Sequence, residues 1–307
     1  MLNVMQHSRP RRAAAILVGL LHVLSAPVTA WAQIPQPAEP ASAASSPASA
    51  AEAHSHADAA LTRQHRMRHL AERALVPPET LKAQCRYESE ITTPPPAKKI
   101  VLTFDDGPEP GATEAILKVL AQHHAPATFF MIGEKVERYP ELVAQMLAQH
   151  PQGLASHSWS HPNFHDIPPA TQEVEVRRSE QELQRVVPDD KLFRYPYGNS
   201  SCETNALLHT LGYRIVGWHI DTCDWAFDRN GSVDAREALE CGVLAQNRKD
   251  YLAHVLSAAR AHNGGIVLMH EIHPRTVAQL DALLSELEKA GFSFGSIRDA
   301  DFQDTLR

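Results

Sequence analysis

Residues 100–108 read Ile-Val-Leu-Thr-Phe-Asp-Asp-Gly-Pro, a run of strand-forming side chains that ends in two carboxylates and a turn. Branched and aromatic side chains favour an extended strand, and Gly-Pro favours a turn directly after it. Comparable apolar runs, each followed by polar residues, recur along the chain as far as His270. We therefore expect this stretch to be the first strand of a buried parallel sheet.

Short apolar runs alternate with helical patterns from residue 98 onwards. The runs predict strands at 100–104, 127–132, 154–156, 192–195, 214–218 and 266–269. Between and after them, apolar spacing predicts helices that include one opened by Pro140, one over 171–187 and a stripe over 277–287. This alternation indicates a parallel sheet covered by helices, either open or closed into a barrel.

The first 32 residues have the composition of a secretory signal. Three arginines precede an apolar run of about a dozen residues, and Ala30 and Ala32 are small residues of the kind found before a cleavage point. The run is short for a membrane span, so we expect cleavage after Ala32 and a secreted or periplasmic protein rather than an uncleaved anchor. Loss of the three arginines changes the net charge from −7 to −10, which disfavours nucleic-acid binding.

The next residues differ in composition from the remainder. Residues 33–57 are predicted to form a disordered linker, because 16 of the 21 residues from Gln33 to Ala53 are Ala, Pro or Ser. Residues 58–97 are predicted to form a helical and extended segment, with a basic helix over 59–75 that ends before Pro77-Pro78. The main ordered domain is then expected over 98–307, with no membrane span after signal cleavage.

Four cysteines are present, and none forms a C-x-x-C pair, which argues against a cysteine zinc site. In an exported protein they can form disulfides, and four cysteines allow three pairings. A Cys223–Cys241 disulfide is favoured, because it would close a long polar segment. Free thiols are the alternative.

Polar side chains gather where predicted strands end. In α/β folds, ligands bind at the carboxyl ends of parallel strands, so these groups are expected on one face as an active site. There are five such clusters, at Thr103–Pro108, His157–His161, Arg194–Gly198, Asp221–Trp225 and Leu268–His270.

His157 and His161 are four residues apart, so on a helical turn both imidazoles can face one cation. A solvated or structural pair is the alternative, but a carboxylate from another strand would complete a site with open positions for water and substrate. Asp105 and Asp106 point to opposite sides of an extended strand, so one can bind metal while the other acts as a base, unless a turn at the strand end brings both into the site. A simple turn with Asx hydrogen bonds is the alternative for Asp-Asp-Gly-Pro. Ser158 occupies the place of the glutamate in H-E-x-x-H, which argues against that metalloprotease class.

Two further residues could serve the same chemistry. Arg194 could orient a carboxylate through a bidentate pair, with an ordinary surface arginine as the alternative. His270 follows a buried strand and could be a general acid, with Asp221 raising its pKa and fixing its orientation. The alternative is a core histidine with its hydrogen bonds satisfied.

Taken in order, the five clusters resemble the motifs of the polysaccharide deacetylases, carbohydrate esterase family 4, which share the NodB-like domain. The chain reads T-F-D-D-G-P, H-S-x-x-H, R-x-P-Y-G, D-x-x-D-W and L-x-H over about residues 98–296. Ala127-Thr128-Phe129-Phe130 also fits the family's second strand. The resemblance implies a deformed (β/α) barrel, usually of seven parallel strands, with the active site at their C-terminal ends.

The resemblance also implies a role for each matching residue. Asp105 would be the catalytic base held by Arg194, and His270 the general acid with Asp221 as its partner. The remaining assignments are Asp106, His157 and His161 as metal ligands, the backbone N–H of Tyr197 as an oxyanion donor, and Trp225, Leu268 and Pro196 as walls of the substrate pocket. The metal is usually zinc, although cobalt or another divalent ion serves in some members.

These assignments predict a monomeric, exported N-deacetylase of an acetylated amino-sugar glycan such as peptidoglycan, a chitin-like chain or an exopolysaccharide. An O-acetyl esterase acting on acetylated xylan and an inactive glycan-binding domain are the alternatives. Glu271 stands where the family commonly has Asp. Residues 226–250 are read as an insertion at the rim of the site.

Overall fold

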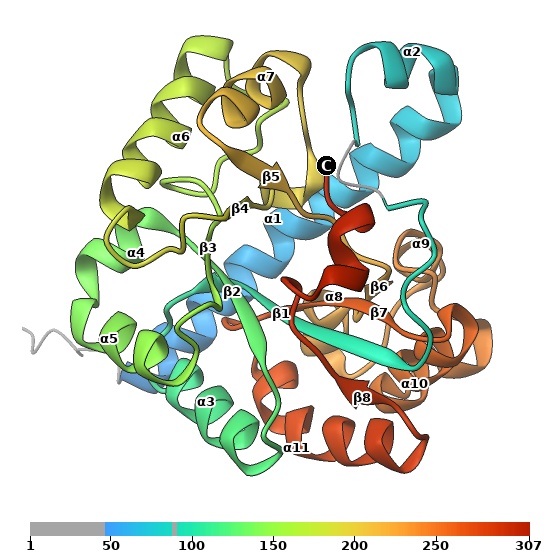
Figure 1. Ribbon diagram of the computed structural model, residues 1–307. Helices are drawn as coiled ribbons and strands as arrows, with labels where there is room; N and C mark the ends of the chain where they lie inside the picture. The colour runs from blue at the N-terminus through green and yellow to red at the C-terminus, as the bar shows by residue number, and fades with distance from the viewer. Residues whose placement is uncertain (1–46, 88–90) are drawn as a thin grey trace, which may run out of the picture. The chain divides into compact units, whose positions relative to one another are not determined.

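A computed structural model describes residues 47–87 and 91–307, with side chains from residue 57 onwards, and its centre is a curled sheet of parallel strands (Figure 1). The signal peptide and residues 33–46 of the predicted linker lie outside the described residues. Within the described part of the chain, no helix is both long enough and apolar enough to cross a bilayer.

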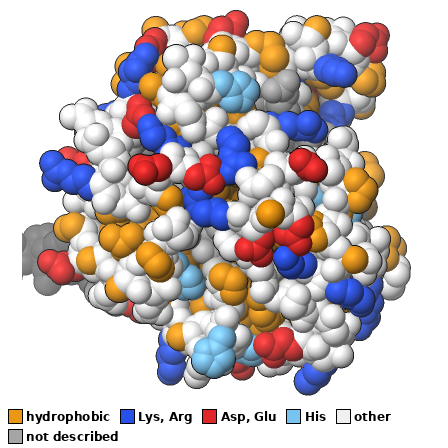
Figure 2. All heavy atoms as spheres, in the orientation of Figure 1, with side chains coloured by type: hydrophobic (Ala, Val, Ile, Leu, Met, Phe, Trp, Pro, Cys, Tyr) orange, Lys and Arg blue, Asp and Glu red, His pale blue; other side chains and the backbone are white. Residues whose placement is uncertain are grey.

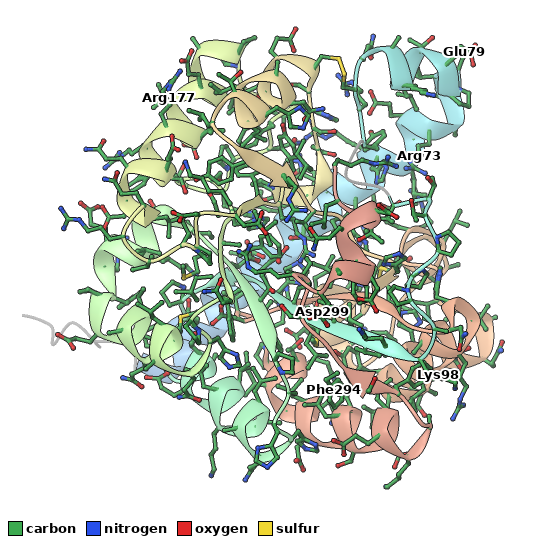
Figure 3. The ribbon with its side chains drawn as sticks, viewed as in Figure 1. Arg73, Glu79, Lys98, Arg177, Phe294 and Asp299 are labelled. Carbon is green, nitrogen blue, oxygen red and sulfur yellow. A yellow bond between two sulfur atoms is a disulfide. The ribbon has the colours of Figure 1, made fainter. Side chains whose placement is uncertain are left out.

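Seven strands follow one another across the sheet in the order β5-β4-β3-β2-β1-β7-β6, and every pair is parallel. Their bounds are β1 Lys99–Gly107, β2 Ala127–Met131, β3 Leu154–Ser156, β4 Lys191–Phe193, β5 Tyr213–Ile215, β6 Ile220–Asp221 and β7 Gly265–His270. An eighth strand, β8 (Ser293–Phe294), pairs with the start of β1, near Lys98 and Phe294 in Figure 3. The predicted seven-stranded deformed barrel is confirmed.

Helices cover the outside of this sheet (Figure 1). Those of the barrel are α3 Ala112–Gln122, α4 Gly133–Arg138, α5 Pro140–Gln149, α6 Pro169–Leu183, α7 Cys202–Thr210, α8 Asp224–Asn230, α9 Ala235–Glu240, α10 Tyr251–His262 and α11 Pro274–Lys289. Three short 3₁₀ helices are η1 Pro196–Gly198, η2 Ala245–Asn247 and η3 Ala300–Thr305. Before β1 come α1 (Pro47–Leu75) and α2 (Pro78–Ala83).

Strand β1 shows how side-chain alternation places the site. Ile100, Leu102 and Phe104 join the large apolar core that includes side chains of α3 and α11, whereas Val101 joins a smaller interior cluster with Phe130. Successive side chains of a strand point to opposite faces, so Thr103 and Asp105 share the interior side with Val101. The alternation therefore carries Asp105 to the top of the barrel interior.

Helix α1 overlaps the end of the predicted disordered linker, where the prediction was wrong. It begins at Pro47, so residues 47–57 are helical rather than disordered. Alanine has the highest helix propensity of the natural residues, and α1 also packs against α8 and α9. An alanine-rich composition, which predicted a flexible linker, is therefore also compatible with a helix that packs on the rest of the protein.

The segment read as an insertion is an ordered part of the core. Residues 226–250 contain most of α8, all of α9 and η2, and they bury Phe227, Val233 and Val243. The predicted Cys223–Cys241 disulfide is confirmed and closes this segment. A second disulfide, Cys85–Cys202, joins the chain just after α2 to the start of α7.

Candidate active site

Asp105 and Arg194 form a buried ion pair at the top of the barrel interior. Nη1 of Arg194 lies 2.7 Å from Oδ1 of Asp105, and both residues are 2% exposed or less. The same guanidinium donates to Thr103 Oγ1 and to the carbonyl oxygen of Gly217, and it lies over the ring of Phe130. Arg194 is thus fixed in place and orients the carboxylate of Asp105, which leaves Oδ2 as the oxygen nearer to His157.

The backbone turns sharply at Asp106, which has φ 72°. A left-handed residue breaks the alternation of a strand, and the register between β1 and β2 shifts between Asp105 and Gly107. Asp106 therefore reaches the same site as Asp105 instead of the opposite face. His161 also has a positive φ of 60°, and its main-chain N–H donates to Ser158 Oγ, so that serine serves the loop.

Asp106, His157 and His161 converge on one point. Nε2 of His161 and Nε2 of His157 lie 3.1 and 3.4 Å from Oδ1 of Asp106. Nδ1 of His157 lies 2.8 Å from the carbonyl oxygen of Arg194, so Nδ1 carries the proton and Nε2 presents a lone pair to the site. The sequence predicted that residues of two clusters, 103–108 and 157–161, would converge in this way.

These three side chains fit a divalent cation. Their donor atoms lie within 4.8 Å of one another, and Oδ1 of Asp106 is buried with no hydrogen-bond donor directed at it. Burial disfavours ionised Asp106, but the neighbouring imidazoles of His161 and His157 hold its pKa well below the usual range, as a metal ligand requires. Two imidazoles and one carboxylate suit zinc and leave positions for other ligands.

His270 faces the same site, but its partner differs from the predicted one. Nδ1 of His270 lies 2.8 Å from Oδ1 of Asp224, and Oδ2 of Asp224 accepts from the main-chain N–H of His270. Asp221 instead pairs with Arg66 of α1 and accepts from the N–H of Cys223. Asp224 is the partner of His270 because α8 begins at Asp224, and the first turn of α8 aims that carboxylate at the end of β7.

The environment keeps His270 protonated. Burial alone would lower its pKa, but the charge of Asp224 and its hydrogen bond raise the pKa of His270 to about 10. The pKa of Asp224 is lowered to about 2, because His270 offsets the cost of burying the carboxylate. The pair is ionised at neutral pH and can deliver a proton. Asp224, His270 and His273 also form a cluster of metal-binding type, but both oxygens of Asp224 already accept hydrogen bonds, so no cation is required there.

A cavity of about 20 Å³ lies among these groups. It is lined by Thr62, Arg66, Asp105, Asp106, His157, His161, Tyr195, Tyr197, Gly198, Trp218, Leu268 and His270. Tyr197 and Leu268 are at the cavity as predicted, whereas Pro196 and Trp225 are absent from its described lining, and Trp225 is buried in the core. Trp218, Thr62 and Arg66 were not predicted, and the latter two come from α1.

Glu271, next to His270, is fully buried beside the turn after β1. Its Oε2 accepts from the hydroxyl of Thr113, and its N–H donates to the carbonyl oxygen of Asp105. A Cβ at Gly107 would overlap the Glu271 carboxyl, so the glycine makes room for it. Burial raises the pKa of Glu271 to about 8, so the carboxyl is protonated at neutral pH.

The sequence is similar to those of known deacetylases. The family model described as polysaccharide deacetylase matches residues 92–216. A chitooligosaccharide deacetylase from Bradyrhizobium is 33% identical over 211 residues, which cover 64% of this chain and 87% of that protein. A peptidoglycan-N-acetylglucosamine deacetylase from Listeria monocytogenes is 34% identical over 207 residues, 65% of this chain. The chain belongs to the polysaccharide deacetylase family.

The fold has the same relatives. A family 4 carbohydrate esterase from Streptomyces lividans, solved in complex with acetate, superposes with a TM-score of 0.54 at 26% identity. The match covers 68% of this chain and 95% of that chain. The aligned part of this chain spans only 38% of the Listeria protein, so that protein extends well beyond the region the two share.

Proposed function

We propose that the chain is an exported, metal-dependent deacetylase that hydrolyses the N-acetyl groups of an amino-sugar glycan to free amine and acetate. The observation that carries the proposal is the convergence of three groups on one cavity. These are the Asp105–Arg194 pair, the cation-binding trio Asp106, His157 and His161, and protonated His270. A base, a cation site and an acid are what amide hydrolysis by water requires.

Each group has a defined task. Asp105, held by Arg194, takes a proton from the attacking water. The N–H of Tyr197 donates to the oxyanion that develops on the acetyl group. His270 then donates its Nε2 proton to the leaving sugar nitrogen, while Asp224 holds Nδ1. A divalent cation at Asp106, His157 and His161 supplies Lewis-acid activation of water and carbonyl when bound.

Separate observations support the proposed metal, the proposed export and the proposed substrate class. Zinc is the proposed metal because the ligand set is two imidazoles and one carboxylate, with cobalt as a functional substitute. Two disulfides support export, since such bonds persist in oxidising compartments. The names of the Bradyrhizobium and Listeria relatives favour N-acetylated chitooligosaccharide or peptidoglycan over O-acetylated xylan.

The test is an acetate-release panel on the zinc-loaded chain. We expect acetate and free amine in equal amounts from N-acetylglucosamine oligomers and from peptidoglycan, and release about 10²–10⁴-fold slower by the Asp105→Asn variant. Acetate from acetylated xylan without any amine product would identify an esterase instead. Glycan binding without either product would identify a binding domain.

A further inference from the structure

Helix α1 covers the active site. Thr62 and Arg66 of α1 line the catalytic cavity, and they are 7% and 5% exposed. The ring of His65 lies 4.2 Å from that of Tyr197, which lies in turn 4.7 Å from the ring of His161. In Figure 1, α1 crosses behind the strands from one side of the barrel to the other.

The space left beneath α1 is too small for a substrate. A cavity of about 20 Å³ holds about one water molecule, whereas pockets for small ligands have about 300–1,000 Å³. Two cavities in that larger range border α1: one of about 300 Å³ reaches Trp218, and one of about 350 Å³ reaches Asn163. Helix α1 thus occupies the middle of a groove whose two flanks remain open.

Ion pairs hold α1 in this position. Arg63 pairs with Asp234 and Glu237 of the 226–250 segment, each at 2.8 Å, and Arg68 donates to Asp166 at 2.9 Å. Arg66 pairs with Asp221, with both side chains buried. In each of these pairs the arginine lies on α1 and the carboxylate lies opposite it, whereas Glu72 of α1 pairs with Arg86 in the opposite sense. On the face shown in Figure 2, by contrast, acidic and basic side chains are interspersed.

We propose that α1 is an autoinhibitory strap that occupies the glycan groove, latched by Arg63 and Arg68, and that an acetylated glycan enters only when α1 is displaced. This inference rests on the proposed function. The Cys85–Cys202 disulfide lies between α1 and the barrel sequence and ties residue 85 to α7. The disulfide therefore shortens the connection between a displaced strap and the barrel to the residues between α1 and Cys85, which keeps the strap near the site.

The test reverses the latch charges in the full zinc-loaded chain. Arg63 and Arg68 have side chains 36% and 51% exposed, so the Arg63→Glu/Arg68→Glu variant buries no new charge. Displacement is read from carbethoxylation of His69, which is 10% exposed in the closed form and pairs with Glu240, and function is read from acetate release. The control is Arg177→Glu, since Arg177 points outward from α6 and pairs only within that helix among the described residues (Figure 3).

We expect both His69 reactivity and acetate release to rise about tenfold, the change that 1.4 kcal/mol of lost latch energy gives. The control should match the wild type. Adding Asp166→Arg to the double variant restores an ion pair with Glu at position 68 and should lower both signals again. That rescue would show that the charges act as a latch.

Three results would overturn the proposal or its basis. Unchanged His69 reactivity in the double variant would overturn the latch. Raised His69 reactivity with unchanged, measurable acetate release would overturn autoinhibition. Raised reactivity with no acetate release from either protein would instead contradict the proposed function, since the helix would have moved and exposed an inactive site.

Discussion

The imidazole of His270 is bound to Asp224 and not to Asp221, with Nδ1 of His270 2.8 Å from Oδ1 of Asp224. Oδ2 of Asp224 accepts from the N–H of His270 and from the hydroxyl of Thr276. Together these hydrogen bonds fix the imidazole ring of His270 so that its Nε2 faces the cavity. The network also holds the proton on His270, because a buried carboxylate at this distance favours the imidazolium.

The Asp224→Asn variant should shift the alkaline limit of activity to lower pH. His270 acts as an acid only while protonated, so activity falls as the pH rises through its pKa, which Asp224 raises to about 10. Without that charge, burial lowers the pKa. The measurement is kcat/KM for acetate release against pH. The control is Asp221→Asn, which should leave the alkaline limb near its wild-type position, and the opposite pattern would restore Asp221 as the partner.

Loss of either histidine ligand should remove both metal and activity. His157→Ala or His161→Ala leaves two protein ligands of three, so we expect metal affinity to fall by at least about 10²-fold and acetate release to disappear. Metal content after dialysis and acetate release are measured on the same samples. The exposed His209 of α7 provides the control, His209→Ala. Full occupancy and activity in both ligand variants would refute the site.

The barrel could be predicted from sequence because its longer strands carry continuous apolar runs. The run at 154–156 matches β3, and the run at 127–132 matches β2 to within one residue. Strands β6 and β8 have two residues each, which is too short for any period to be visible. The 226–250 segment looked polar because its apolar residues are spaced irregularly, yet Phe227 and Val243 are buried.

The site residues could be predicted where they lie in motifs at the ends of strands. They could not be predicted where they meet only through packing between distant segments. The cation-binding trio follows from motifs at strand ends. The choice between Asp221 and Asp224 depended on where α8 begins, which the D-x-x-D-W motif leaves open. The contact of Arg66 with Asp221 joins residues 155 positions apart, and only the folded chain shows it. The sequence predicted a basic helix over 59–75, but it did not indicate which carboxylates its arginines would meet.

Glu271→Gln should make stability less dependent on pH. Burial raises the pKa of Glu271 from 4.5 to about 8, so its neutral form is favoured in the folded chain. A raised pKa contributes stability below pH 4.5 that is lost as the pH rises towards 8, at a cost on the order of a few kcal/mol. Free energies of unfolding from pH 4.5 to 8 should fall in the wild type and in Glu286→Gln, whose original side chain is 42% exposed, but less in Glu271→Gln. Equal slopes in all three would show that Glu271 is ionised when folded.

The two adjacent aspartates should separate into a base and a ligand. Arg194 binds Asp105 at 2.7 Å, whereas Oδ1 of Asp106 faces Nε2 of both histidines. Asp105→Asn should therefore keep most of the metal and lose about 10²–10⁴-fold in turnover, the usual value of general-base catalysis.

Asp106→Asn should lose metal and rate together and recover part of its rate in excess metal. Metal content and acetate release on the same preparations decide between the roles, and thermal melting confirms that each variant is folded. Because Asn at position 105 leaves the buried Arg194 without its counter-charge, a lower Tm is expected there even with metal retained. A metal-poor Asp105→Asn beside a fully loaded Asp106→Asn would reverse the assignment.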